Sequence, residues 1–117
     1  MGVIREADTP VVLDEDGTVL RMTEAGEMTV ELDVLEPNLD VDHLFEGLPD
    51  NCCQAEHWGY VIEGEDVVAV AGDAYYVPPG HRPHSGSEGA RVVEFSKTED
   101  FNKTMEVVER NMQSLKR

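Results

Sequence analysis

Apolar and polar residues alternate in short runs along most of the chain. In the segment 28–34 every second residue is apolar, and Thr29, Glu31 and Asp33 lie between the apolar positions. A period of two is typical of a β-strand with one face in the core, so the three polar side chains are predicted to point outward. Further short runs predict strands at residues 11–13, 18–23, 58–62, 67–70, 74–77 and 91–95.

Turn residues separate these runs. The segment 14–17 ends in Asp-Gly, which is a strong signal for a β-hairpin. Residues 39–51 are different, because Asp40 is expected to cap one short helical turn that carries Leu44 and Phe45. Repeated short strands with glycine and proline turns predict an all-β sandwich or barrel.

The period changes at the C-terminus. Apolar residues there recur at intervals of four and three, at Phe101, Met105, Val108, Met112 and Leu115. This spacing predicts one amphipathic helix over about residues 98–115, and Ser96 followed by Glu99 is interpreted as its capping box. The apolar stripe packs either on the chain's own β-fold or on a second chain. The expected organisation is a lead-in over residues 1–9, one β-domain over 10–97 and the helical segment 98–117.

The charge of the chain excludes some partners. Among 117 residues, 25 are acidic and 9 are basic, which gives a net charge of −16. Such a surface repels phosphate backbones and anionic lipids, so neither nucleic acid nor membrane is an expected partner. The charge indicates either a solvated surface or adaptation to high salt. No apolar run reaches about 18 residues and no signal-peptide core is present, so the expected location is the cytoplasm.

Candidate metal ligands are concentrated in two segments, 52–64 and 72–84, which contain both cysteines and three of the four histidines. On a strand, Cys53 and His57 share one face, and a twist or bulge is needed to bring them to one metal ion. His81 and His84 follow the Pro78-Pro79-Gly80 turn and can return over the sheet.

Each of these residues also has a structural interpretation. Cys53 could be a small buried apolar residue, and His57 a hydrogen-bonded interior histidine. Convergence of several soft donors favours a metal site formed by Cys53, His57 and either His81 or His84. The remaining candidates are expected to be structural: Cys52 and Glu56 on the opposite strand face, His43 on the surface and Asp73 in a turn.

The two segments resemble the paired motifs of the cupin superfamily. The segment 60–64 matches the end of the first motif, and Gly72, Pro78 and Gly80 match the second in spacing. The chain is more similar still to small cupins that have a Cys, then His-Trp-Gly-Tyr-Val, then Pro-Pro-Gly-His. The resemblance covers residues 39–112 and implies a small jelly-roll β-barrel with one C-terminal α-helix.

Within that subset, the ligand positions would correspond to Cys53, His57 and His81. The set differs from the His-His-Glu-His ligands of ordinary metal cupins, so their oxygen chemistry is not implied. Only seven residues separate Gly64 from Gly72, where the family has a full hairpin, so a barrel trimmed at this corner is expected.

A cysteine and histidine ligand set is soft and favours Zn²⁺, with Fe²⁺, Ni²⁺ and Mn²⁺ as alternatives. Three functions fit the sequence. The first is a metal-dependent enzyme acting on a small carboxylate or carbonyl compound, with His81 or His84, whichever is not a ligand, as its base. The second is a non-catalytic cupin that binds a metal or small ligand as a sensor. The third is a dimeric protein with a vestigial pocket. A homodimer is expected because Trp58, Tyr60 and Ile62 leave an apolar outer strand face.

Overall fold

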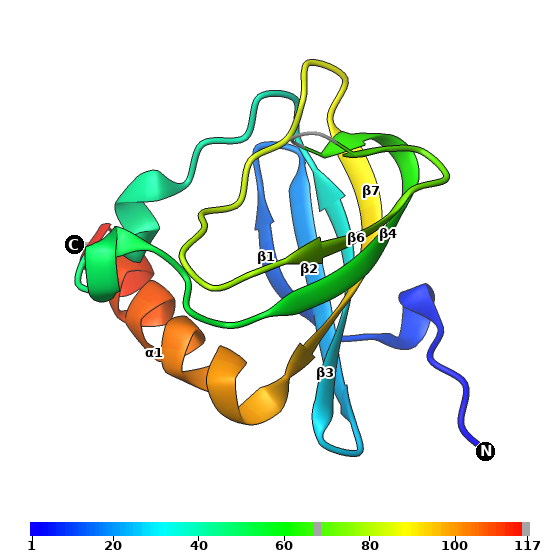
Figure 1. Ribbon diagram of the computed structural model, residues 1–117, viewed down its shortest axis with the longest axis horizontal. Helices are drawn as coiled ribbons and strands as arrows, with labels where there is room; N and C mark the ends of the chain where they lie inside the picture. The colour runs from blue at the N-terminus through cyan, green and yellow to red at the C-terminus, as the bar shows by residue number, and fades with distance from the viewer. Residues whose placement is uncertain (67–68, 116–117) are drawn as a thin grey trace.

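The protein is a curled antiparallel sheet with one long helix beside it (Figure 1), and the computed structural model describes residues 1–66 and 69–115. The strands are β1 (Val11–Glu15), β2 (Thr18–Ala25), β3 (Met28–Leu35), β4 (His57–Asp66), β5 (Ala69–Val70), β6 (Ala74–Val77) and β7 (Ala90–Lys97). The helical elements are the short 3₁₀ turns η1 (Glu6–Asp8), η2 (Asp42–Phe45) and η3 (Pro49–Asn51) and the helix α1 (Thr98–Leu115).

The strand and turn predictions are largely confirmed. Each predicted strand lies inside an observed one, except that the first two residues of the predicted strand 67–70 lie outside the described residues. Asp16 and Gly17 both have positive φ, as a tight hairpin turn between β1 and β2 requires. The predicted helical turn is η2, and its Leu44 and Phe45 are buried.

The sheet is not closed into the predicted barrel. Its order is β1-β2-β3-β7-β4-β5, with β6 paired to β4, and no described residue pairs β1 with β5 or β6. The segment between β3 and β4 forms η2 and η3 in place of a long strand. Only isolated bridges remain there, at Asp40 and Cys53. Pro49 and the left-handed backbone of Asp50 and Asn51 prevent an extended run, which explains why this part of the sheet is missing.

The prediction that the polar face of β3 points outward is wrong. Thr29, Glu31 and Asp33 are each only 5% exposed and do not point outward. Glu31 and Asp33 line the interior of the curled sheet, while Leu32 and Val34 are half-buried on the outer face. Alternation fixes the period of a strand but not which face is interior, and a shift of one residue exchanges the faces. Polar residues of β3 therefore form part of the inside of this sheet.

The helix α1 is confirmed over the predicted range, and it packs on its own chain. Phe101 and Val108 are buried against Leu44, Phe45 and Ala55. Figure 1 shows α1 beside η2 and η3, at one side of the curled sheet. None of the described helices is long and apolar enough to cross a membrane.

The capping-box interpretation of Ser96 is wrong. Ser96 belongs to β7, is fully buried and lies with its hydroxyl oxygen 2.6 Å from His57 Nδ1. The helix begins two residues later, at Thr98, whose hydroxyl contacts that of Thr29 at 2.9 Å. A serine three residues before a glutamate fits both a cap and a strand end, so the sequence pattern could not separate them.

Candidate metal site and cavity

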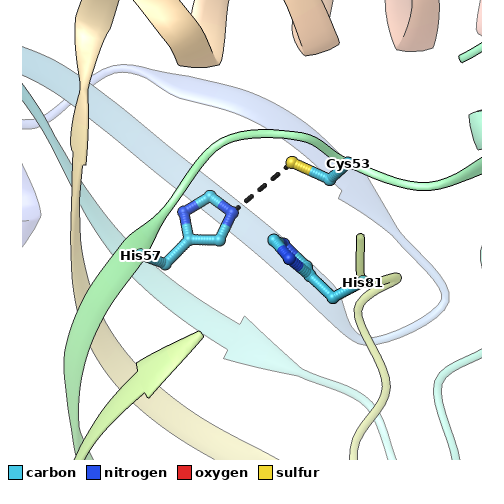
Figure 2. A group of neighbouring side chains, drawn as sticks. All are labelled: Cys53, His57 and His81. Atoms are coloured by element: carbon cyan, nitrogen blue, oxygen red, sulfur yellow. Dashed lines mark hydrogen bonds between the residues drawn. The ribbon is translucent and has the colours of Figure 1, made fainter. Parts of the chain in front are cut away.

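Cys53, His57 and His81 converge inside the curled sheet (Figure 2). Two backbone hydrogen bonds hold Cys53 next to His81. Cys53 N–H donates to the His81 carbonyl at 2.7 Å, and His81 N–H donates to the Cys53 carbonyl at 3.3 Å. The first residue of β4 is His57, and its Nε2 lies 3.6 Å from Cys53 Sγ. The ring centroids of His57 and His81 are 4.7 Å apart.

The spacing of these donor atoms suits a tetrahedral metal ion. One potential ligand atom from each of the three residues lies within 4.8 Å of the other two. Zn²⁺ with bonds of about 2.3 Å to sulfur and about 2.0–2.1 Å to nitrogen separates the two ligand atoms by about 3.5–3.6 Å at the tetrahedral angle. The Sγ–Nε2 distance of 3.6 Å matches that value. The donor set therefore fits a metal in both its chemistry and its spacing.

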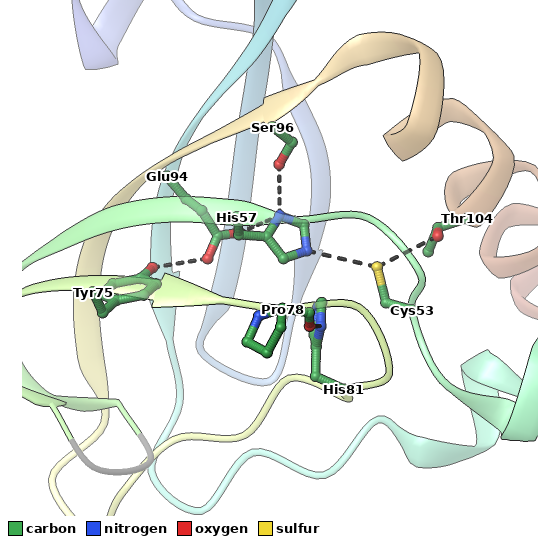
Figure 3. A network of polar contacts seen from close by, with 8 residues as sticks. All are labelled: Cys53, His57, Tyr75, Pro78, His81, Glu94, Ser96 and Thr104. Atoms are coloured by element: carbon green, nitrogen blue, oxygen red, sulfur yellow. Dashed lines mark hydrogen bonds and ion pairs between the residues drawn. The ribbon is translucent and has the colours of Figure 1, made fainter.

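Hydrogen bonds orient both imidazoles (Figure 3). His81 Nδ1 donates to the Pro78 carbonyl at 2.7 Å, which leaves Nε2 of the neutral ring without a proton. His57 Nδ1 lies 2.6 Å from Ser96 Oγ and 3.5 Å from Glu94 Oε2. When this Nδ1 carries the proton, Nε2 faces Cys53 as a free donor. Metal-binding histidines commonly use one ring nitrogen for such an outer partner and the other for the metal.

Burial sets the protonation of the three side chains. It lowers the pKa of His57 to about 4 and also lowers the pKa of His81, so both imidazoles are neutral at pH 7. Burial raises the pKa of the Cys53 thiol, although Thr104 Oγ1, 3.4 Å from Sγ, acts in the opposite direction. Without a metal Cys53 is a thiol, and coordination would release its proton.

His84 does not join this group. Its Nε2 lies 3.1 Å from Asp42 Oδ1, and Asp40 completes a more exposed acidic group around it. The structure thus brings His81, and not His84, to Cys53 and His57.

The other cysteine and histidine lie outside the three-residue group, although β4 begins only at His57 and Cys52 is therefore not on the predicted strand face. His43 is exposed, and Cys52 is half-exposed with its thiol 3.3 Å from the Asp50 carbonyl. Asp73 accepts a hydrogen bond from Val70 N–H within a turn. Glu56 accepts a hydrogen bond from the Tyr76 hydroxyl at 2.6 Å.

An acidic cluster lies on the Nδ1 side of His57. Glu31 on β3 faces Glu94 on β7 across the sheet, and Asp33 follows on the same face of β3. The Tyr75 hydroxyl donates to Glu94 Oε1 at 2.8 Å. A side chain at Gly59 would overlap the Tyr75 ring, so this position of β4 must be a glycine for the contact to form.

Burial is the main reason why these carboxyl groups resist ionisation. It raises the pKa of Asp33 to about 7 and the pKa of Glu31 well above its usual value, and neighbouring carboxylates add to both effects. Burial is also the main cause that raises the pKa of Glu94. Glu31, His57 and Glu94 also form a second possible ligand group, which shares His57 with the first.

Sequence reasoning missed most of this surrounding network. It assigned Glu31 and Asp33 to the solvent face and Ser96 to a helix cap. Glu94 and Thr104 gave no signal, because only the register of β7 and the packing of α1 bring them to His57 and Cys53. One available clue to the burial of Glu31 and Asp33 was their position in a central strand. A strand that is paired on both sides can bury either of its faces.

Both groups open on one cavity of about 670 Å³, which is a typical volume for a small-molecule site. Its wall is mainly apolar and includes Leu20, Met22, Leu35, Val41, Phe45, Val92, Phe101, Met105 and Val108. Cys53, His57 and His81 form one part of the lining, and Glu31, Asp33 and Glu94 form another.

The chain has a cupin fold, as the sequence motifs predicted, because its curled antiparallel sheet is similar to those of solved cupin structures. The chain is similar to an RmlC-like cupin from Shewanella frigidimarina, with 20% identity over 84% of this chain and 93% of that one, at a TM-score of 0.55. It is also similar to the polyketide cyclase RemF from Streptomyces resistomycificus, with 18% identity over 82% and 78% of the two chains, at a TM-score of 0.53.

The EutQ protein of Clostridium difficile has a similar structure, with 18% identity over 82% of this chain and 80% of that one, at a TM-score of 0.50. No family model matches the chain, and no curated protein matches its sequence. At such identities the likeness establishes the fold and leaves the activity to be argued from the site.

Proposed function

We propose that this cupin-fold protein binds a divalent transition metal through Cys53, His57 and His81 and holds a small molecule beside it. The observation that carries the proposal is the 3.6 Å spacing of Cys53 Sγ and His57 Nε2, together with the hydrogen bond that leaves His81 Nε2 free. The soft donor set favours Zn²⁺, with Fe²⁺, Ni²⁺ and Mn²⁺ as alternatives. The metal site and the ligand cavity are continuous.

The arrangement also suits catalysis on a small carboxylate or carbonyl compound. Three protein ligands leave one position of a tetrahedral ion open, and a metal bound there would act as a Lewis acid. The apolar wall excludes water around the ligand, while Ser96 and the Pro78 carbonyl hold the two imidazoles in place. His84 lines the same cavity and is paired with Asp42, which makes it the candidate base. A non-catalytic sensor would use the same residues, and turnover that is lost on chelation separates the two functions.

Elemental analysis of the purified protein tests the metal proposal. We expect close to one transition-metal ion per chain in the wild type and a large loss in Cys53→Ser, His57→Ala and His81→Ala, because each substitution removes one ligand. Zn²⁺ should be the main ion when the protein is reloaded from an equimolar mixture of the four metals.

His84→Ala is the matched control, because it removes a histidine of the same cavity that lies outside the three-residue group. This variant should retain the metal content of the wild type. Equal metal content in all variants would remove the three residues from the site. A wild type that neither carries nor takes up metal would favour the protein with a vestigial pocket.

We also propose that the protein forms a homodimer through the outer face of its sheet. The support is a patch of exposed large apolar side chains on three adjacent strands, formed by Trp58, Tyr60, Ile62, Tyr76 and Phe95. The buried residues of the α1 stripe pack within the chain, so this patch is an apolar surface that remains for a second copy. A self-complementary patch is what a twofold dimer requires.

The dimer proposal predicts a solution mass of twice 13.0 kDa by light scattering after size exclusion. Tyr60→Glu should shift the protein to the monomer, because it places a charge within the buried patch of an already acidic protein. Val11→Glu introduces the same charge at an exposed apolar residue of the edge strand β1 and should leave the mass unchanged. A monomeric wild type at high concentration would contradict the proposal.

A further inference from the structure

The acidic end of the cavity has more hydrogen-bonding capacity than the protein satisfies. Glu31 and Asp33 are nine-tenths buried or more, and both line the cavity. Within the described part of the chain, Glu31 Oε1 and Asp33 Oδ1 have no hydrogen-bond partner. Buried carboxyl oxygens are normally paired, and leaving one unpaired is unfavourable by about 1–3 kcal/mol. Both side chains line the cavity, so a ligand can approach their carboxyl groups.

The surrounding carboxyl groups favour a positively charged donor, because a cation bound between them stabilises their ionised form. Glu94 faces Glu31 across the strand pair, so three carboxyl groups lie close together. Among the described residues that line the cavity, Arg82 is the one with a permanent positive charge, and it lies 3.6 Å from Asp42. The net charge of −16 raises the local concentration of cations around the protein. The protein thus supplies acceptors at this end of the cavity and no cation of its own.

The rest of the cavity favours an organic ligand over a bare metal ion. Oxygen-binding metal ions take about six or more ligands, mostly carboxylates, carbonyls and water. The wall next to this cluster is formed by apolar side chains such as Leu20, Leu35 and Val92. A ligand with an apolar body covers that surface, while an inorganic ion leaves it bare.

We propose that the cavity binds an organic cation, a protonated amine with an apolar body, whose ammonium group is held between Glu31, Asp33 and Glu94. The ammonium donates to the carboxyl groups of Glu31 and Asp33, and the body lies along the apolar wall. The inference rests on the small-molecule cavity of the proposed function but does not depend on the metal, because the acidic cluster lies on the opposite side of His57 from Cys53.

Calorimetric titration with hexylamine, which is protonated at pH 7.5, tests this inference against two probes of the same chain length, 1-hexanol and hexanoate. Charge-assisted hydrogen bonds are worth about 1.5–3 kcal/mol, so hexylammonium should bind about tenfold to a hundredfold more tightly than hexanol. Hexanoate should bind most weakly because its charge is repelled. Glu31→Gln and Asp33→Asn keep the side-chain shape and should each reduce the preference for hexylammonium over hexanol by about tenfold.

The ratio of the two affinities is the readout because a general loss of cavity structure weakens both probes alike. Glu63→Gln removes an exposed carboxylate of β4 and should leave the ratio unchanged. Equal binding of hexylammonium and hexanol, or an unchanged ratio in both cavity variants, would overturn the inference. Chelator-treated and Zn²⁺-loaded samples are titrated in parallel. Zn²⁺ uptake without amine binding refutes this inference alone, and amine binding without metal uptake supports it while refuting the metal proposal.

Discussion

Asp33→Asn is expected to raise the free energy of unfolding of the metal-free protein by about 2–4 kcal/mol at pH 8. Burial is the first cause that raises the pKa of Asp33 from 3.8 to about 7, and the neighbouring carboxylates Glu94 and Asp66 contribute. One pKa unit corresponds to about 1.4 kcal/mol, so an ionised Asp33 destabilises the folded state by up to about 4 kcal/mol. Asparagine has nearly the same shape and carries no charge.

The effect should depend on pH in a defined direction. Between about pH 4 and pH 7 the folded protein holds a proton on Asp33 that the unfolded chain has lost, so stability falls as the pH rises through this range. His57 acts in the opposite direction, because its folded pKa of about 4 makes stability fall as the pH drops below 6.5. Asp33→Asn removes only the first contribution, so its advantage over the wild type should shrink from pH 8 to pH 5.

Urea unfolding followed by Trp58 fluorescence at several pH values measures this difference in chelator-treated samples. Asp14→Asn, on the exposed edge strand β1, is the control and should change stability little at any pH. If Asp33→Asn were less stable than the wild type at pH 8, the carboxylate would be making a favourable interaction and the cluster would be structural.

The sequence predicted those features that depend on local period and spacing. Alternation located the strands, and the four-and-three spacing located α1 over about the observed residues Thr98–Leu115. Motif spacing selected Cys53, His57 and either His81 or His84, and the structure brings His81 to Cys53 through an isolated bridge. These features are encoded within short segments, so a single sequence is sufficient to recognise them.

Features that depend on pairing between distant segments could not be predicted. The outward assignment of Glu31 failed because the period of a strand does not determine which face is interior. The contacts of His57 with Glu94 and Ser96 follow from the register of β4 against β7, which no local pattern specifies. The open sheet follows from the irregular backbone near Pro49, where one β-strand of a closed barrel would otherwise lie.

Phe101→Ala is expected to lower the free energy of unfolding by about 3–5 kcal/mol, the usual effect of emptying a buried phenylalanine site. Phe101 is buried with Leu44 and Phe45 in the cluster that joins α1 to η2 and to the segment before β4. Its ring also meets the His57 ring edge-on, with centroids 5.6 Å apart. Chemical unfolding of the metal-free variant measures the loss, and circular dichroism at zero denaturant shows whether the remaining protein is folded.

Leu115→Ala is the control, because Leu115 belongs to the same apolar stripe but is 65% exposed and should change stability by less than about 0.5 kcal/mol. Equal effects of the two substitutions would mean that α1 is not part of the core. A large loss of stability in Phe101→Ala alone would mean that packing of α1 supports the candidate site. Thr104, one turn after Phe101, contacts the Cys53 thiol. Zn²⁺ uptake by Phe101→Ala should then weaken as well, because the turn that supports both His57 and Cys53 has lost its packing.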